Sequence, residues 1–80
     1  MIAVDPLADR VRALVAEALE VPERQLDEGL TRAQAPTWDS LTHLRLVGLL
    51  EEELGVRFPM SQVAELDSVA AIVDAVRRAQ

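Results

Sequence analysis

Cysteine is absent from this chain of 80 residues, and histidine occurs once, at His43. The lack of cysteine excludes a disulfide framework and a thiolate metal site, and it leaves the redox compartment undetermined. A single histidine also excludes a metal site with several histidine ligands. We therefore expect no metal site in this protein.

Aromatic residues are equally scarce, since Trp38 and Phe58 are the only two. A stacking platform for bases or sugars needs more rings than these. The net charge of -6 also disfavours contact with phosphate backbones, so we expect no nucleic-acid partner. An acidic chain suits partners that carry basic patches.

Long apolar runs are missing too, although 50% of the residues are hydrophobic. No segment is long enough to span a membrane, and the N-terminus has neither a charged leader nor an apolar signal core. We expect a cytoplasmic, monomeric protein with no membrane partner. Its length predicts a single domain over residues 1–80, without room for a deep active-site cleft.

Apolar residues at helical spacing predict a first helix over residues 5–20. Asp5 is a natural N-cap, Pro6 fits the first turn, and Val21-Pro22 ends the helix. Residues 21–39 lack periodicity and form a long loop, which is unusual in so small a domain and typical of a functional segment. Three apolar residues should attach this loop to the core: Val21, Leu26 and Leu30.

A second helix is predicted from Ser40 to Leu54, with Asp39 or Ser40 as its N-cap and Gly55 in the left-handed position after its end. At about 100° per residue, four apolar residues form its core face: Leu46, Val47, Leu50 and Leu54. Further apolar residues lie on a different arc, at Leu41 and Leu44. This surplus either contacts other helices or is exposed for a partner.

The remaining chain predicts an extended link over residues 56–59 and one or two helical turns over residues 60–66, with Val63 and Leu66 directed inward. Asp67 or Ser68 then caps a last helix. Its apolar positions are Val69, Ile72, Val73 and Val76, and its last turn holds Arg77 and Arg78. The predicted fold is all-α: an antiparallel four-helix bundle of three long helices and one short helix.

Ser40 can serve as a nucleophile, as a helix cap or as an anchor for a modification. A nucleophile needs a base and an orienting carboxylate. His43 follows on the same helix but points in a different radial direction, and no G-x-S-x-G turn is present, so a hydrolase is disfavoured. We expect His43 to be packed and hydrogen-bonded in the core, and Trp38 to cover the junction of loop and helix.

The residues Asp39-Ser40-Leu41 head an amphipathic helix that ends with Glu51-Glu52-Glu53, and in this the chain resembles the acyl carrier proteins. The resemblance covers nearly the whole chain: helix, long loop, D-S-L helix, short helix and final helix. The run W-D-S-L-T-H-L-R-L, residues 38–46, is most similar to free-standing carriers of secondary-metabolite pathways such as polyketide biosynthesis. Peptidyl carriers usually have a glycine and a histidine before the serine, so an acyl carrier is favoured over a peptidyl or aminoacyl carrier.

The resemblance implies that Ser40 carries 4′-phosphopantetheine, transferred from coenzyme A by a separate phosphopantetheinyl transferase with Mg²⁺. It implies that acyl groups travel on this arm as thioesters, and that the protein has no catalytic residues of its own. The implied partners are acyl-loading and acyl-processing enzymes such as an acyltransferase, a ketosynthase or a ligase. A rival hypothesis is an acidic helical docking domain without covalent attachment.

Partner contacts are expected around and beyond the serine, at Asp39, Leu41, Leu44, Arg45, Gly48, Glu51 and Glu52. Lysines and arginines of partners can recognise the glutamates, although a solvated helix face is the simpler interpretation of each one. His43 and Arg45 occupy positions where fatty-acid carriers often have neutral or acidic residues. The resemblance therefore does not extend to the partners of fatty-acid synthases. The short segments before Asp5 and after Ala79 favour a free-standing protein over an excised module.

Overall fold

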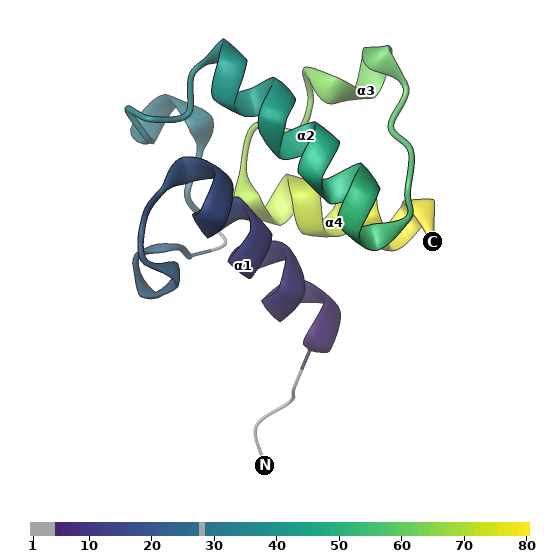
Figure 1. The fold of residues 1–80 in the computed structure, drawn as a ribbon, viewed down its shortest axis with the longest axis horizontal. Coiled ribbons are helices and arrows are strands. Elements are labelled where there is room, and N and C mark those ends of the chain that lie inside the picture. The colour runs from purple at the N-terminus through teal and green to yellow at the C-terminus, as the bar shows by residue number, and fades with distance from the viewer. Residues whose placement is uncertain (1–4, 28) are drawn as a thin grey trace.

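The computed structural model describes residues 5–27 and 29–80; residues 1–4, which precede the first helix, and residue 28 lie outside it. Its α-helices are α1 (Pro6–Leu19), α2 (Ser40–Leu54), α3 (Met60–Val63) and α4 (Val69–Ala79). Figure 1 shows α1 and α2 running in opposite directions, with α3 at the edge of the molecule. The predicted all-α fold of three long helices and one short helix is confirmed.

Each long helix begins where a short polar side chain accepts the amide proton of the residue three positions later, which satisfies one of the unpaired amides of the first turn. The caps are Asp5, Asp39 and Ser68, with donor–acceptor distances of 3.2, 2.8 and 3.0 Å. The sequence left two choices at each of the later helices. The structure selects Asp39 over Ser40 and Ser68 over Asp67.

The C-termini of α1 and α2 both end in a left-handed residue. Gly55 has φ 65°, as its position after Leu54 predicted. At the end of α1 the left-handed residue is Glu20, with φ 59°, and the amide of Val21 donates to the carbonyl of Ala16 at 3.1 Å. The sequence predicted the stop at this point but not the backbone conformation, because glutamate rarely adopts it.

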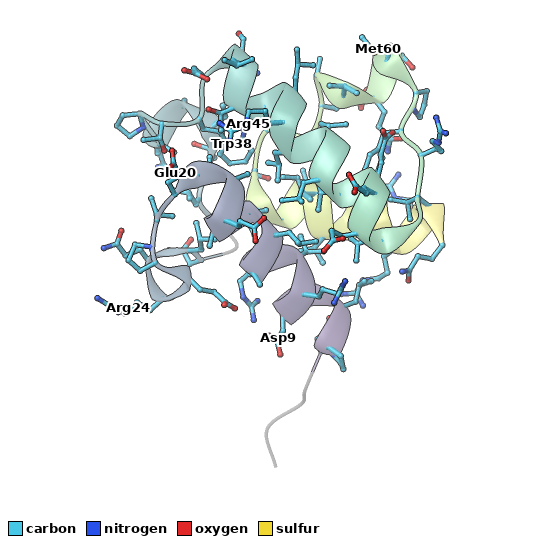
Figure 2. All side chains as sticks on the ribbon, in the orientation of Figure 1. Asp9, Glu20, Arg24, Trp38, Arg45 and Met60 are labelled. Carbon is cyan, nitrogen blue, oxygen red and sulfur yellow. The ribbon has the colours of Figure 1, made fainter. Side chains whose placement is uncertain are left out.

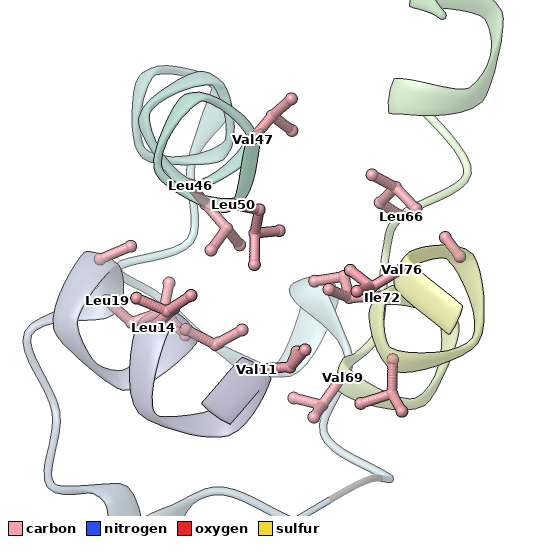
Figure 3. Close-up of a cluster of buried hydrophobic side chains, with 14 of the residues drawn as sticks. Val11, Leu14, Leu19, Leu46, Val47, Leu50, Leu66, Val69, Ile72 and Val76 are labelled. Atoms are coloured by element: carbon pink, nitrogen blue, oxygen red, sulfur yellow. The ribbon is translucent and has the colours of Figure 1, made fainter. Parts of the chain in front are cut away.

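The core lies between α1, α2 and α4, whose apolar side chains converge in Figure 3. The largest fully buried side chains are Val11, Val15, Leu19, Leu46, Leu50, Leu66, Val69, Ile72 and Val76. On α2 the predicted core face is confirmed for Leu46, Val47 and Leu50, while Leu54 is partly buried against the same cluster. Within the described residues, no helix has the length and apolarity needed to cross a membrane.

The long loop between α1 and α2 is more regular than its sequence suggests. It contains two short 3₁₀ helices, η1 (Glu23–Gln25) and η2 (Arg32–Gln34), and an isolated bridge between Thr31 and Ser68 joins it to the start of α4. Leu26 is buried, and Val21 and Leu30 pack against the core, so the predicted attachment of the loop is confirmed. The sequence missed the 3₁₀ helices because segments of three residues have no periodicity to read.

Candidate functional site

Ser40 is the first residue of α2, and it is exposed. The carboxylate of Asp39 turns away from it, because one of its oxygens accepts the amide proton of Thr42 at 2.8 Å. In an α-helix the amides of the first two residues point past the N-terminus without a partner in the helix. Here these are the amides of Ser40 and Leu41, so the serine hydroxyl sits where backbone donors and the helix dipole favour an anion.

Two hydrogen bonds and one buried side chain fix the chain just before Ser40. The Thr37 hydroxyl donates to the carbonyl of Leu19 at 3.1 Å, which joins the end of the loop to the end of α1. Trp38 is buried, with 2% of its surface exposed, and its ring nitrogen donates to Nδ1 of His43 at 2.9 Å. The residues that precede the serine are therefore attached to the end of α1 and to the core.

His43 lies below the serine in the core, with 4% of its surface exposed. Because Nδ1 accepts the proton of Trp38, the other ring nitrogen, Nε2, carries the imidazole proton and donates it to the Val63 carbonyl at 2.8 Å. Both ring nitrogens are thus engaged away from Ser40. The expectation of a packed, hydrogen-bonded histidine is confirmed, and the geometry offers Ser40 no general base from this residue.

Arg32 is the site residue that sequence reasoning missed. Its Nη2 donates to Oγ of Ser40 at 3.1 Å, and its Nε donates to the carbonyl of Trp38 at 3.2 Å. The residue belongs to η2, eight positions before the serine, in the segment without periodicity. The one available signal was its positive charge within a loop that leads to the site.

The charge of Arg32 also acts on Asp39. The pKa of the Asp39 carboxyl is lowered, chiefly by the hydrogen bond from the Thr42 amide, then by the Thr42 side chain, with a smaller contribution from the Arg32 charge. Asp39 is therefore an anion at neutral pH. The site combines one carboxylate, one guanidinium and an exposed hydroxyl.

An open pocket of about 290 Å³ lies beside the serine, between the first turns of α2 and the short helix α3. Its lining residues are Arg32, Ser40, His43, Leu44, Met60, Val63 and Ala64. Most of the wall is apolar. Met60 on α3 belongs to it, is 79% exposed and lies at the edge of the molecule in Figure 2. A group attached to Ser40 would start beside this apolar wall and beside Arg32.

The surplus apolar residues of α2 face solvent. Leu41 is 68% exposed and Leu44 is 57% exposed, so of the two alternatives, contact with other helices or exposure, the structure shows exposure. Arg45, Gly48 and Glu52 are also exposed, and Figure 2 shows Arg45 on the first half of the helix. The residues expected to contact partners thus form one accessible helix surface.

Glu51 differs from the other predicted contact residues. It is partly buried, and its carboxylate accepts the amide proton of Phe58 at 2.8 Å. This bond holds the link between α2 and α3 against the end of α2. Glu51 therefore has a structural partner, whereas Glu52 and Glu53 are exposed.

Comparisons with known proteins agree with this geometry. A family model described as "Phosphopantetheine attachment site" matches residues 9–76. A protein of Saccharopolyspora erythraea named acyl carrier protein is 30% identical over 66 residues, which cover 82% of this chain and 70% of the relative. Proteins of the same name from Thermosynechococcus vestitus and Treponema pallidum are 35% identical over 69 residues (85% of this chain, 84% of the relative) and 38% identical over 66 residues (82% and 85%). The matched segment runs from α1 to α4 and includes the whole loop and Ser40.

Proposed function

Because the chain belongs to the acyl carrier proteins, non-catalytic carriers with a covalent 4′-phosphopantetheine group, we propose that Ser40 is the residue that bears this group. The observation that carries the proposal is the position of its hydroxyl, exposed at the first residue of α2 and hydrogen-bonded by a guanidinium. Neither of the other serines has this setting. Ser68 is occupied as the cap of α4, and Ser61 lies within the four-residue helix α3.

The residues around Ser40 fit the chemistry of the group. Its link to the protein is a phosphodiester, which carries a negative charge at neutral pH. The amides of Ser40 and Leu41 and the dipole of α2 favour an anion at this point. The guanidinium of Arg32, which contacts Oγ, adds a full positive charge.

Attachment is a phosphoryl transfer in which Ser40 is the nucleophile. Oγ attacks the phosphorus of coenzyme A that bears the pantetheine, the pyrophosphate bond breaks, and adenosine 3′,5′-bisphosphate leaves. The hydroxyl proton passes to a base of the transferase, since His43 is turned away, and Mg²⁺ on that enzyme balances the phosphate charge. When bound, the arm supplies a terminal thiol that holds acyl groups as thioesters, a function that the cysteine-free chain cannot supply itself.

Acyl carrier proteins serve biosynthetic enzymes, and we assign this one to a secondary-metabolite pathway such as polyketide synthesis. The support is the run from Trp38 to Leu46, which is similar to carriers of that type. An acyltransferase, a ketosynthase or a ligase is the expected kind of partner. Residues 1–80 then act as one carrier domain, in keeping with the single core that α1, α2 and α4 share.

The partner surface in this proposal is the exposed side of α2. Leu41 and Leu44 supply apolar contact area, and the exposed Glu52 supplies negative charge for basic residues of the partner. The remaining members of the surface are Asp39, Arg45, Gly48 and Glu51. Because its carboxylate accepts the Phe58 amide proton, Glu51 should contribute least to partner binding.

Incubation with a promiscuous phosphopantetheinyl transferase, Mg²⁺ and coenzyme A tests the attachment. Intact-mass spectrometry of the wild type should show a gain of one phosphopantetheinyl group, and peptide mapping should place it on Ser40. Ser40→Ala should show no gain, because it lacks the nucleophile.

Ser61→Ala is the matched control, since it removes an exposed serine from the neighbouring helix and should be modified like the wild type. An unmodified wild type, or an undiminished gain in Ser40→Ala, contradicts the proposal. Circular dichroism of Ser40→Ala should match the wild type, because Asp39 and not Ser40 caps α2.

A further inference from the structure

Arg32 has two side-chain contacts at the attachment site, and both restrict the guanidinium. Nε donates to the carbonyl of Trp38 at 3.2 Å while Nη2 donates to Ser40 at 3.1 Å. Trp38 is 2% exposed, so the core fixes the position of its carbonyl. The guanidinium is therefore anchored through Nε, while Nη2 is directed at the serine.

The backbone of Arg32 is held as well. Its amide donates to the carbonyl of Asp67 at 2.8 Å, within the bridge that joins the loop to the start of α4. Restriction at both ends lowers the entropy that the side chain loses when it binds a ligand. The guanidinium is thus preorganised beside Ser40 before any group is attached there.

A fixed guanidinium at this place matches a phosphodiester better than it matches a hydroxyl. Arginine only donates hydrogen bonds, and its donors form a planar fork that fits the paired oxygens of a phosphate. A phosphate ester forms on Oγ, the atom that Nη2 already contacts, and its phosphorus carries two non-bridging oxygens one bond further out. The contact seen with the hydroxyl then becomes an ion pair.

The neighbouring carboxylate increases the need for a cation. Asp39 is an anion at the same helix end, and two anions at adjacent residues repel one another. Arg45, the next arginine along α2, lies about 140° around the helix axis from Ser40. Arg32 contacts the Ser40 hydroxyl directly, so it is the cation placed to offset this repulsion.

We propose that Arg32 binds the phosphodiester of the group attached to Ser40 and thereby sets the direction in which the arm leaves the protein. The inference rests on the proposed attachment to Ser40 and adds a residue that holds the arm at its base. Arg32 also lines the pocket beside the serine, together with Leu44 on α2 and Met60 on α3. Its ion pair keeps the phosphate on the loop side of that pocket.

Nuclear magnetic resonance of the modified protein tests the proposal, with Arg32→Gln as the variant and Arg24→Gln as the control. Both substitutions remove one positive charge from the same loop, and Figure 2 shows Arg24 at its outer edge, directed away from Trp38. The ³¹P resonance of the wild type and of Arg24→Gln should be shifted from its position in the same protein unfolded in urea. In Arg32→Gln the resonance should lie near the unfolded position.

Two further measurements need only the wild-type protein: the salt dependence of the ³¹P shift and the resonance of the Arg32 side chain. The ³¹P shift of the wild type should shrink as the salt concentration rises from about 0.05 to 1 M, because screening shortens the reach of the ion pair. The ¹⁵N–¹H resonance of Arg32 Nε should move when apo protein is converted to modified protein. Equal ³¹P positions in wild type and Arg32→Gln, with an unmoved Arg32 resonance, overturn the inference.

This experiment distinguishes failure of the proposed attachment to Ser40 from failure of the proposed role of Arg32. A wild type that gains no mass, or gains it away from Ser40, overturns the attachment and the role of Arg32 together. A wild type modified on Ser40 whose ³¹P resonance keeps its unfolded position overturns the role of Arg32 alone. Arg32→Lys retains the charge but not the fork, and it should keep part of the shift.

Discussion

At the scale of single residues, the site depends on the different positions of Ser40 and His43, which lie three residues apart on α2. Ser40 is exposed at the helix end, whereas His43 is 4% exposed in the core. The histidine connects the indole of Trp38 to the carbonyl of Val63, and so joins the loop before the serine to α3. Its role is to position the support of the site and not to react.

His43→Ala tests this structural role. The substitution leaves a buried indole N–H and a buried carbonyl without their partner and opens a cavity, so the free energy of unfolding should fall by about 2–4 kcal/mol. Chemical denaturation measures the loss. Leu44→Ala, at the exposed neighbouring position, should stay within about 0.5 kcal/mol of the wild type. A His43→Ala protein as stable as the wild type contradicts the two hydrogen bonds.

The contact between Arg32 and Ser40 could not be predicted from the sequence. Ser40 could be singled out because Asp39-Ser40-Leu41 begins a periodic helix. The contact between Arg32 and the serine depends on how the loop returns to α4 through Asp67, and no local spacing encodes that path. A positive charge within a loop does not by itself identify the side chain that it will contact.

At the scale of elements, α2 has one buried side and one exposed side, and Gly48 lies on the exposed side. A Cβ atom built on it meets nothing within 4 Å, so packing within the chain does not require a glycine there. Glycine inside a helix is unfavourable relative to alanine. A bare backbone in the middle of the proposed partner surface is suited to close approach by another protein.

Gly48→Ala should therefore raise the free energy of unfolding by about 0.5–1 kcal/mol, through the gain in helix propensity. Denaturation of the isolated protein measures this gain. If partners approach the bare backbone, the same variant should be a poorer substrate for the acyl-processing enzyme, with a raised KM. Unchanged kinetics with all partners would remove Gly48 from the proposed surface, while a loss of stability would contradict its open surroundings.

The cap of α2 predicts a pH dependence of stability. The pKa of Asp39 is lowered in the folded protein, first by the Thr42 amide, so the folded state favours the ionised carboxylate. The stabilising effect is fully present above the ordinary carboxyl pKa of about 4 and is lost as the pH falls through the lower folded-state value. Thermal unfolding between about pH 6 and pH 2.5 should show this loss in the wild type.

Asp39→Asn separates the cap from the charge, because asparagine caps helices about as well as aspartate. Its melting temperature should fall less on acidification than that of the wild type. Asp5, whose pKa is lowered chiefly by its hydrogen bond with Arg77 and also by the Ala8 amide, remains in both proteins and accounts for part of the residual acid sensitivity. Parallel curves for the two proteins would contradict the contribution of Asp39.

At the scale of the whole molecule, the loop is held by α4 although it leads to α2. The amide of Arg32 donates to Asp67, and the amide of Val69 donates to Leu30 at 3.1 Å. These bonds join segments far apart in the sequence and lie over the shared core. The position of the site thus depends on the packing of all three long helices.

Hydrogen exchange tests this long-range attachment. The amides of Arg32 and Val69 should exchange about tenfold or more slowly than those of Gln25 and Leu26, which donate only to Pro22 and Glu23 within η1. A bond across the fold opens only when the loop leaves α4, whereas a local turn opens by itself. Equal exchange at the four amides would show that the loop opens independently of the core.

The sequence by itself determined the long helices, the cap of α1 and the serine at the head of α2, and it left two cap candidates at α2 and at α4. These features follow from short-range physics: the 3.6-residue period, the capping preference of Asp5, and the left-handed Gly55. The tertiary structure decided the hydrogen-bond partners of His43, the exposure of Leu41 and Leu44, and the placement of Arg32 against Ser40. These depend on contacts between segments distant in the chain, where the direction of a loop and the packing of helices decide which side chains meet.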